Sequence, residues 1–368
     1  MTTTTTAAVV ESGGAGFTLS DVELSEPQAG EVRVRVVAAG VCHTDLTVAS
    51  GALPFPLPGV LGHEGAGVVE AVGPGVDRVA VGDNVLLSFT SCGRCVHCRD
   101  GHPAYCTTWV PLNLIGGARL DGTSPVRRDG ADLGGHFFGQ SSFARQAIVD
   151  ERSLVEVAAD APLELLAPLG CGVQTGAGAV WNVLDPRPGA RLLVTGAGAV
   201  GLSAVMAAAL TPALQIIAVD RVPARLELAG EVGATDTIDT STADLEAAVA
   251  ELTGGHGVDG VVETTGNVEV LEAAVRSLAV RGTAVMVGAP AFGSTAAVDV
   301  NFMLPGRNVV GLTLGDSETE TLIPVLVDLV AGGRLPIGKL IGHYEFEDIN
   351  TAVEDMTSGT TIKPVLTF

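Results

Sequence analysis

The 368-residue sequence has little positive charge and few aromatic side chains. Lysine and arginine together number 20 against 42 aspartates and glutamates, which gives a net charge of −22, and aromatic residues make up 4%. A surface this acidic repels phosphate backbones and anionic lipids, so we expect neither a nucleic acid nor a membrane as a partner. No apolar run reaches the roughly 18 residues that a membrane-spanning helix needs.

The N-terminal segment also lacks a basic residue ahead of an apolar stretch. A secretory signal peptide has that arrangement, so its absence predicts a cytoplasmic protein. We expect the threonine tract at residues 2–6 to be a frayed tail before the first strand.

Apolar residues and glycine are abundant, and their pattern changes at Cys171. Hydrophobic residues make up 47% of the chain, enough to form a core in each of two domains. Before residue 150, short strands such as residues 31–39, in which valine alternates with charge, are separated by glycine and proline. This pattern predicts an irregular β-rich domain, in which residues 110–140 form a long polar loop.

After Cys171, apolar strands alternate with helical patterns such as residues 199–210 and 223–233. The strands are expected at residues 192–196, 215–220, 235–239, 260–264, 283–288 and 309–314. Six strands with helical crossovers predict an α/β fold with a doubly wound parallel sheet.

A glycine fingerprint follows the first of these strands and opens an apolar helix. It consists of Gly196, Ala197, Gly198, Ala199, Val200 and Gly201. The spacing allows a tight turn, a close approach of backbone to a pyrophosphate, and packing of helix on strand, which predicts a dinucleotide site. Asp220 ends the second strand, where an acid binds the ribose hydroxyls and favours NAD over NADP. The neighbouring Arg221 leaves NADP open, because an arginine there could hold a 2′-phosphate.

Four of the six cysteines lie within one short segment. They are Cys92, Cys95, Cys98 and Cys106. Clustered cysteines in a long chain without a signal peptide are more often metal ligands than disulfides. Four thiolates complete a tetrahedral shell, which predicts a structural zinc site, with a four-iron cluster as the chemical alternative.

The remaining cysteines, Cys42 and Cys171, could bind a second metal together with His63. Two sulfurs and one nitrogen would leave a fourth position free for water or substrate. Taken singly, each of these residues also has an ordinary structural interpretation, since a lone cysteine is usually a small buried hydrophobe.

These motifs together resemble the zinc-dependent medium-chain dehydrogenase/reductase family over nearly the whole chain. The run GHEGAGVVEAVGPGV (62–76), the four-cysteine segment, GCGVQTGAG (170–178) and the glycine fingerprint occur in the family's order. The resemblance implies a GroES-like β-rich catalytic domain in residues 1–176, with a zinc lobe at about 90–110. It also implies a Rossmann domain in residues 177–313 and a return to the catalytic domain in residues 314–368.

Within the family, the sequence is most similar to the aryl-alcohol (benzyl-alcohol) dehydrogenase branch. The stretches that carry this similarity are GVCHTDL (40–46), GDS (315–317), LPIGKL (335–340) and TIKPVLTF (361–368).

The resemblance implies that Cys42, His63 and Cys171 bind a catalytic zinc ion. It places Glu64 behind the metal as a nearby acid or transient ligand. Asp45 is implied to hydrogen-bond the free nitrogen of His63 and to fix its tautomer.

Other residues take their implied roles from the same resemblance. Thr44 is expected to contact the substrate oxygen, His43 and Lys363 to lie near the pyrophosphate, and Thr175 to approach the nicotinamide. Thr47 stands where many family members have the histidine that ends a proton relay. Because threonine is no base near neutral pH, the relay would have to end in water or in His43.

The sequence therefore predicts an NAD-dependent dehydrogenase with two zinc ions per chain, one catalytic and one structural. Its substrates are expected to be primary alcohols with an aromatic or allylic group, oxidised reversibly to aldehydes, with Phe89 and Trp109 lining an apolar pocket or simply packing in the core. A formaldehyde or polyol dehydrogenase of the same family, and a non-catalytic dinucleotide sensor, are the alternatives. We expect a homodimer or homotetramer.

Overall fold

The computed structural model describes residues 2–368, and the chain divides into two units. The first unit contains the chain up to Cys171 together with Glu318–Asp328 and Ile337–Phe368. The second unit contains Gly172–Ser317 and Leu329–Pro336.

This division differs in detail from the expected domain ranges. Residues 172–176 and 314–317 belong to the second unit, although we expected both in the catalytic domain. The return segment also gives residues 329–336 to the second unit, so helix α10 (Thr319–Ala331) begins in one unit and ends in the other.

The second unit is built on a six-stranded sheet whose paired strands all run parallel. In sheet order the strands are β13 (Asp236–Asp239), β12 (Gln215–Asp220), β11 (Arg191–Thr195), β14 (Val258–Glu263), β15 (Leu278–Met286) and β16 (Asn308–Gly311). Numbered along the chain this order is 3-2-1-4-5-6, the Rossmann order, and it confirms the predicted doubly wound sheet. The order reverses between β11 and β14, which is where such a sheet opens a crevice for a ligand.

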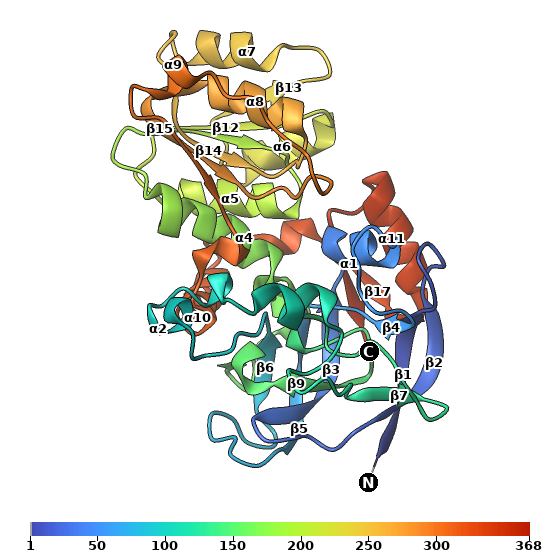
Figure 1. Cartoon of the computed structure of the whole chain (residues 1–368). Helices are drawn as coiled ribbons and strands as arrows, with labels where there is room; N and C mark the ends of the chain where they lie inside the picture. Colours follow the sequence, from blue (N-terminus) through green and yellow to red (C-terminus); the bar gives the residue numbers. More distant parts are fainter. Residues whose placement is uncertain (1) are drawn as a thin grey trace. The chain divides into compact units, whose positions relative to one another are not determined.

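Helices cover both faces of this sheet, with α7 and α8 on one side and α5 on the other (Figure 1). The helices of this unit are α4 (Gly172–Gly178), α5 (Ala199–Ala209), α6 (Pro223–Glu231), α7 (Leu245–Leu252), α8 (Val268–Arg276) and α9 (Val300–Met303). Leu193, Ile217 and Val261 are completely buried beneath α7 and α8. The central strands β11 and β12 carry continuous apolar runs because both faces of the sheet are covered.

The first unit contains two largely antiparallel sheets. The five-stranded sheet consists of β4 (Gly59–Val60), β1 (Thr3–Val10), β2 (Thr18–Leu24), β7 (Val126–Arg128) and β8 (Ala131–Asp132). The seven-stranded sheet consists of β10 (Leu154–Val157), β6 (Asn84–Leu87), β5 (Gly65–Val72), β3 (Glu31–Gly40), β18 (Lys363–Thr367) and β17 (Ile341–Glu345), with β9 (Gln146–Asp150) paired to β3. The unit's helices are α1 (His43–Ala49), α2 (Val96–Arg99), α3 (Leu163–Leu166) and α11 (Ile349–Ser358).

The threonine tract is strand rather than frayed tail, so the expectation for residues 2–6 was wrong. Strand β1 begins at Thr3 and pairs antiparallel with β2, with Thr3 opposite Leu24 and Val9 opposite Thr18. Threonine is β-branched and fits a pleated, half-buried surface. Hydrogen-bonded pairing with β2 therefore orders this segment, although its composition suggested an unstructured terminus.

The prediction of one long polar loop at residues 110–140 was also wrong. This segment contains a short π-helix at Pro111–Ile115 and the antiparallel pair β7 and β8, of which β7 extends the five-stranded sheet beside β2. Arg119 lies in the segment and forms a two-pronged ion pair with Glu31, with contacts of 2.6 and 3.0 Å. Both side chains are nearly buried. The Arg119 side chain therefore attaches this segment to Glu31, the residue at which β3 begins.

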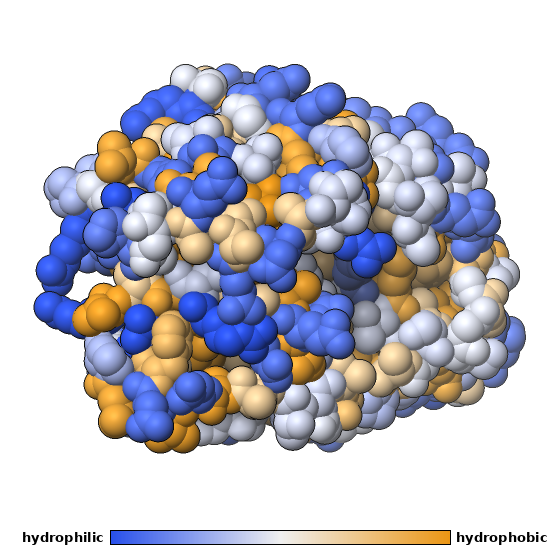
Figure 2. Space-filling view, turned by 90° about the horizontal axis from the view of Figure 1, so that it is seen from above, coloured by the Kyte–Doolittle hydropathy of each residue, from blue (hydrophilic) through white to orange (hydrophobic). Residues whose placement is uncertain are grey.

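None of the helices in the described residues is both long and apolar enough to cross a membrane. Hydrophilic residues are spread over the face seen in Figure 2, among scattered hydrophobic ones.

Candidate active site

Four potential metal ligands come together in the first unit from distant parts of the chain. One ligand atom from each of Cys42, His63, Glu64 and Cys171 lies within 4.8 Å of the others. Cys42 caps the amino end of α1 directly after β3, and His63 and Glu64 precede β5. Cys171 follows the turn at Ala167–Gly170. The fold thus assembles two sulfurs and one imidazole as the sequence predicted, with a carboxylate beside them.

Asp45 fixes the orientation of both His63 and Cys42. Its Oδ1 atom lies 3.0 Å from Nδ1 of His63 and also accepts a hydrogen bond from the backbone N–H of Gly62 at 3.0 Å. Its Oδ2 atom accepts from the backbone N–H of Cys42 at 3.0 Å. Asp45 is completely buried in the first turn of α1. This is the contact that the family resemblance implied, and it holds Nε2 of His63 as the free nitrogen.

The free nitrogen has the environment of a metal ligand. Nε2 of His63 is buried and has no hydrogen-bond partner, although a buried polar atom normally has one. A zinc ion held by two sulfurs and one imidazole would satisfy it, so the residues fit zinc.

Electrostatics in this group follow from burial among charges. Burial lowers the pKa of His63, but the Asp45 charge and hydrogen bond outweigh it and raise the pKa to about 10. A hydrogen bond to Cys171 lowers the pKa of Cys42, and the same bond, with burial, raises that of Cys171. This bond favours the thiolate at Cys42 over that at Cys171, and a bound dication would favour the thiolate at both.

Lys363 has a different partner from the one expected. We placed it near the pyrophosphate, but its ammonium lies 2.9 Å from each carboxylate oxygen of Glu64 and donates to the carbonyl of Val41 at 3.0 Å. The Lys363 side chain is 4% exposed and that of Glu64 0%. Burial raises the pKa of Glu64 and the nearby lysine opposes that rise. The acid predicted behind the metal is thus held by a buried ion pair.

Gln140 clamps the backbone on both sides of the His63–Glu64 pair, and sequence reasoning missed it. Its Nε2 donates to the carbonyls of His63 and Ser88, at 3.0 and 2.7 Å, and its Oε1 accepts from the N–H of Gly65 at 3.1 Å. Gln140 is fully buried. Nothing in its local sequence distinguishes it from an ordinary loop glutamine.

Thr44 lies beside the metal group, whereas Thr47 and His43 are exposed. The Thr44 hydroxyl is 3.8 Å from the Cys42 sulfur. The Thr47 hydroxyl donates to the backbone carbonyl of His43 at 2.9 Å, one turn earlier in α1. Thr47 therefore bonds back within its own helix, and it has no basic group that could end a proton relay.

Aromatic rings pack against the buried imidazole of His63. The ring of Phe138 stacks on it with centroids 4.4 Å apart, and Phe137 meets it edge-on at 5.4 Å. Trp109 packs edge-on against Phe138 at 5.7 Å. This predicted pocket residue is therefore linked to His63 by way of Phe138, which the sequence did not predict. Phe89 lines a separate hollow of about 150 Å³ beside Cys98.

The four-cysteine segment forms the second potential metal site. One sulfur from each of Cys92, Cys95, Cys98 and Cys106 lies within 4.8 Å of the others. The backbone N–H groups of Cys98 and Thr107 lower the pKa of Cys95 to about 5, which favours its thiolate. Four sulfurs with backbone donors fit a closed structural zinc site.

The glycine fingerprint lies where the second unit's sheet can accept a dinucleotide. Gly196 follows β11 with φ of +88°, a conformation that side chains rarely adopt. A Cβ atom at Gly201 would lie 1.8 Å from the carbonyl oxygen of Gly196, so only glycine fits there. A Cβ at Gly198 would meet nothing within 4 Å, which leaves its side open to a ligand. Ala199 and Val200 form the first turn of α5, whose amino end favours a phosphate.

Asp220 is held rigidly beside this loop. Its carboxylate accepts hydrogen bonds from the backbone N–H groups of Ala197, Arg221 and Val222, at 2.7, 2.7 and 3.0 Å. The Arg221 side chain is exposed. Thr175 is buried on α4, which packs closely on α5.

Comparison with known proteins agrees with these features. The family model for the alcohol dehydrogenase GroES-like domain matches residues 28–159, and that for zinc-binding dehydrogenases matches residues 199–329. A geraniol dehydrogenase from Castellaniella defragrans is 42% identical and the match covers 98% of this chain and 97% of that protein.

Solved structures give the same result. An alcohol dehydrogenase zinc-binding domain protein from Burkholderia ambifaria is 49% identical, with a TM-score of 0.97 over 100% of both chains. A benzyl alcohol dehydrogenase from Acinetobacter calcoaceticus is 45% identical, with a TM-score of 0.95 over 100% of this chain and 99% of that one. These matches confirm the predicted GroES-like and Rossmann fold. The chain therefore belongs to the aryl-alcohol branch of the zinc-dependent medium-chain dehydrogenase/reductase family, and it is an alcohol dehydrogenase.

Proposed function

We propose that this protein oxidises primary alcohols bearing an aromatic or allylic group to aldehydes, reversibly and with NAD. The observation that carries the chemistry is the buried group of two sulfurs and an imidazole, in which Nε2 of His63 has no partner. The substrate class is supported by the similar proteins that act on benzyl alcohol and on geraniol, and by the aromatic rings beside His63.

Cys42, Cys171 and His63 would hold a catalytic zinc ion, with Asp45 keeping the imidazole in its tautomer. A zinc ion supplies Lewis acidity that makes a bound alcohol easier to deprotonate, and NAD supplies the ring that accepts hydride. Thr44, whose hydroxyl lies 3.8 Å from the Cys42 sulfur, would take the hydroxyl proton. Since Thr47 has no basic group, the proton then passes to water or to His43.

Phe137, Phe138 and Trp109 would exclude water and favour a flat or unsaturated substituent. Asp220 favours NAD because its anchored carboxylate would repel a 2′-phosphate.

The test is a substrate panel scored as kcat/KM with NAD and with NADP. The panel contains benzyl alcohol, a primary allylic alcohol, ethanol, sorbitol and S-hydroxymethylglutathione. We expect kcat/KM for benzyl and allylic alcohols to exceed that for ethanol by about a hundredfold. Burying one or two additional apolar groups of a substrate has an effect of this order. Similar values for benzyl alcohol and ethanol would reject the substrate class, and a preference for S-hydroxymethylglutathione or sorbitol would assign one of the alternatives. Equal use of NADP would reject the role of Asp220.

A further inference from the structure

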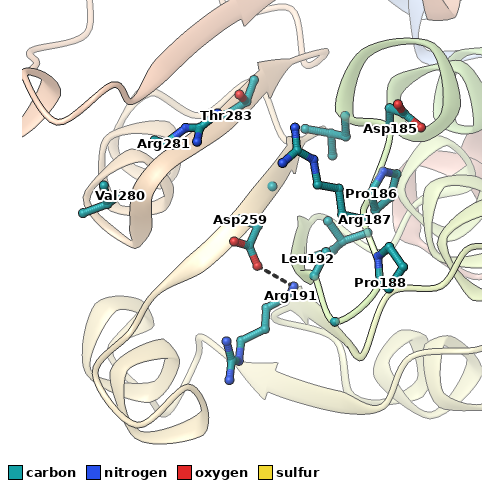
Figure 3. Close-up of a pocket in the computed structure, with 14 residues that line it drawn as sticks. Asp185, Pro186, Arg187, Pro188, Arg191, Leu192, Asp259, Val280, Arg281 and Thr283 are labelled. Atoms are coloured by element: carbon teal, nitrogen blue, oxygen red, sulfur yellow. Dashed lines mark hydrogen bonds between the residues drawn. The ribbon is translucent and has the colours of Figure 1, made fainter.

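A second hollow lies in the Rossmann unit, far along the strands from the glycine fingerprint. It has a volume of about 520 Å³ and is lined by residues at the amino ends of β11, β14 and β15 (Figure 3). The glycine fingerprint follows the carboxyl end of β11, which is the end at which a doubly wound sheet binds its dinucleotide. The hollow is therefore separate from the coenzyme site, and the dehydrogenase chemistry gives it no role.

Positive charge is concentrated around this hollow in a chain that has little of it. Arg187, Arg191 and Arg281 all line it, although the whole chain has only 20 lysines and arginines for its net charge of −22. Within residues 2–368 none of the three guanidinium groups has a hydrogen bond or an ion pair. Most other arginines of the chain have a carboxylate partner, as Arg276 does with Glu246. Three uncompensated guanidinium groups favour an anionic ligand.

The two carboxylates at the hollow form no ion pair with these arginines within residues 2–368. Asp259 accepts a hydrogen bond from the backbone N–H of Arg191 at 2.8 Å, so it anchors the start of β11 rather than a guanidinium group (Figure 3). Asp185 also lines the hollow and precedes the turn that carries Arg187. The formal charge of the lining is still positive.

Backbone features present two of the arginines in fixed positions. Arg187 lies between Pro186 and Pro188, whose rings restrict the turn. Arg281 has φ of +66°, which is rare for a residue with a side chain, and its N–H donates to the carbonyl of Pro305 at 3.2 Å. It lies where the pairing of β15 with β14 is interrupted. Such backbone irregularities redirect side chains and are frequent beside binding sites.

We propose that this hollow binds a small phosphate-bearing molecule with at least two negative charges, held by Arg187 and Arg281 with Arg191 at the edge. The planar guanidinium fork binds the oxygens of carboxylates and phosphates in pairs, and several such forks around one hollow suit the larger number of oxygens on a phosphate. The volume is that of a small-molecule site, and Leu184 and Val280 offer apolar contact to the rest of the ligand.

The test is calorimetric titration of the full-length protein with inorganic pyrophosphate, with sulfate as the comparison anion. The variants are R187Q/R281Q and, as a matched control, R276Q, an exposed arginine of the same unit that already has carboxylate partners. We expect pyrophosphate to bind the wild type more tightly than sulfate. Its dissociation constant should rise by about tenfold or more in R187Q/R281Q, the loss of two charge-assisted contacts, and stay within about twofold in R276Q.

R187Q alone should also weaken binding, and it leaves the unusual backbone of Arg281 untouched, so it covers the case in which the double variant does not fold. Binding that is unchanged in R187Q/R281Q would place pyrophosphate at the glycine fingerprint or on a metal, and would overturn the proposal. An equal loss in R276Q, or no binding to the wild type at millimolar pyrophosphate, would overturn it as well.

Discussion

The two groups of potential metal ligands in this protein are built in opposite ways. The four cysteines of the lobe lie between Cys92 and Cys106, and three of them are only half-buried. The catalytic group joins Cys42 to Cys171 across several strands. Three charged residues, Asp45, Glu64 and Lys363, are buried beside it. The lobe therefore depends on a short segment, whereas the catalytic group depends on the whole first unit. This difference predicts which changes should affect activity and which should affect stability.

The largest expected effect is on activity. Cys42→Ser removes one sulfur from the catalytic group and should lower kcat/KM by about a thousandfold or more, since the metal's electrostatic contribution is lost. Its circular dichroism spectrum and thermal midpoint should remain close to those of the wild type, because the lobe is unaffected. Retained activity in a protein shown to have lost its catalytic zinc would contradict the assignment.

The next effect concerns the buried ion pair. Lys363→Met removes the ammonium group that is ion-paired with the fully buried Glu64 and should lower the free energy of unfolding by about 3–5 kcal/mol. Denaturant unfolding measures this change. Lys339→Met is the matched control, as the chain's only other lysine is exposed, and it should cost under about 1 kcal/mol. K363M/E64Q should recover part of the lost free energy of unfolding. An equal loss in K363M and K339M would show that the ion pair contributes no more to stability than an exposed lysine.

A substitution in the four-cysteine lobe should affect stability more than activity, which is the opposite of the effect expected for Cys42→Ser. Cys95→Ser breaks the closed shell and should lower the free energy of unfolding by about 3 kcal/mol, in the range of losing a structural metal ligand. The activity per catalytic zinc should fall by less than about threefold, because no ligand of the catalytic group changes. Calorimetry and kcat together check this. A thousandfold loss of kcat with an unchanged thermal midpoint would reverse the roles of the two groups.

Asp45→Asn should give the smallest of these effects. The amide has one accepting oxygen where the carboxylate has two, so it loses a backbone hydrogen bond or its hold on the His63 imidazole. The zinc affinity of the catalytic group should therefore fall by about 10–100-fold. Asp244→Asn is the matched control, since Asp244 likewise caps a helix but lies in the second unit. Metal titration after selective removal of the catalytic zinc distinguishes the two. An equal change in D244N would mean that only helix capping was measured.

The sequence predicts those parts of the molecule whose signals are local. The six strands of the Rossmann sheet follow from apolar runs, and the fingerprint glycines from steric needs that the structure shows at Gly196 and Gly201. The four-cysteine lobe follows from spacing alone. The grouping of Cys42 with Cys171 came from resemblance to a family, because nothing local links them.

What the sequence did not predict depends on contacts between distant segments. Lys363 reaches Glu64 because β18 pairs with β3, and neither residue signals the other. Gln140 and Phe138 lie in an irregular loop whose path is set by the sheet around it. The threonines of β1 are ordered by β2, whose partnership outweighs their polar composition. Buried polar contacts of this kind have no sequence period to reveal them.

We expect each chain to hold two zinc ions in unlike ligand shells. Zinc analysis with X-ray absorption at the zinc edge tests it most directly. We expect two zinc ions per chain and an average shell of about three sulfurs near 2.3 Å and about one nitrogen or oxygen near 2.0–2.1 Å, since four sulfurs at one site and two at the other average to three. A single zinc ion per chain with a shell of sulfur alone would contradict the claim, because the group around His63 would then hold no metal.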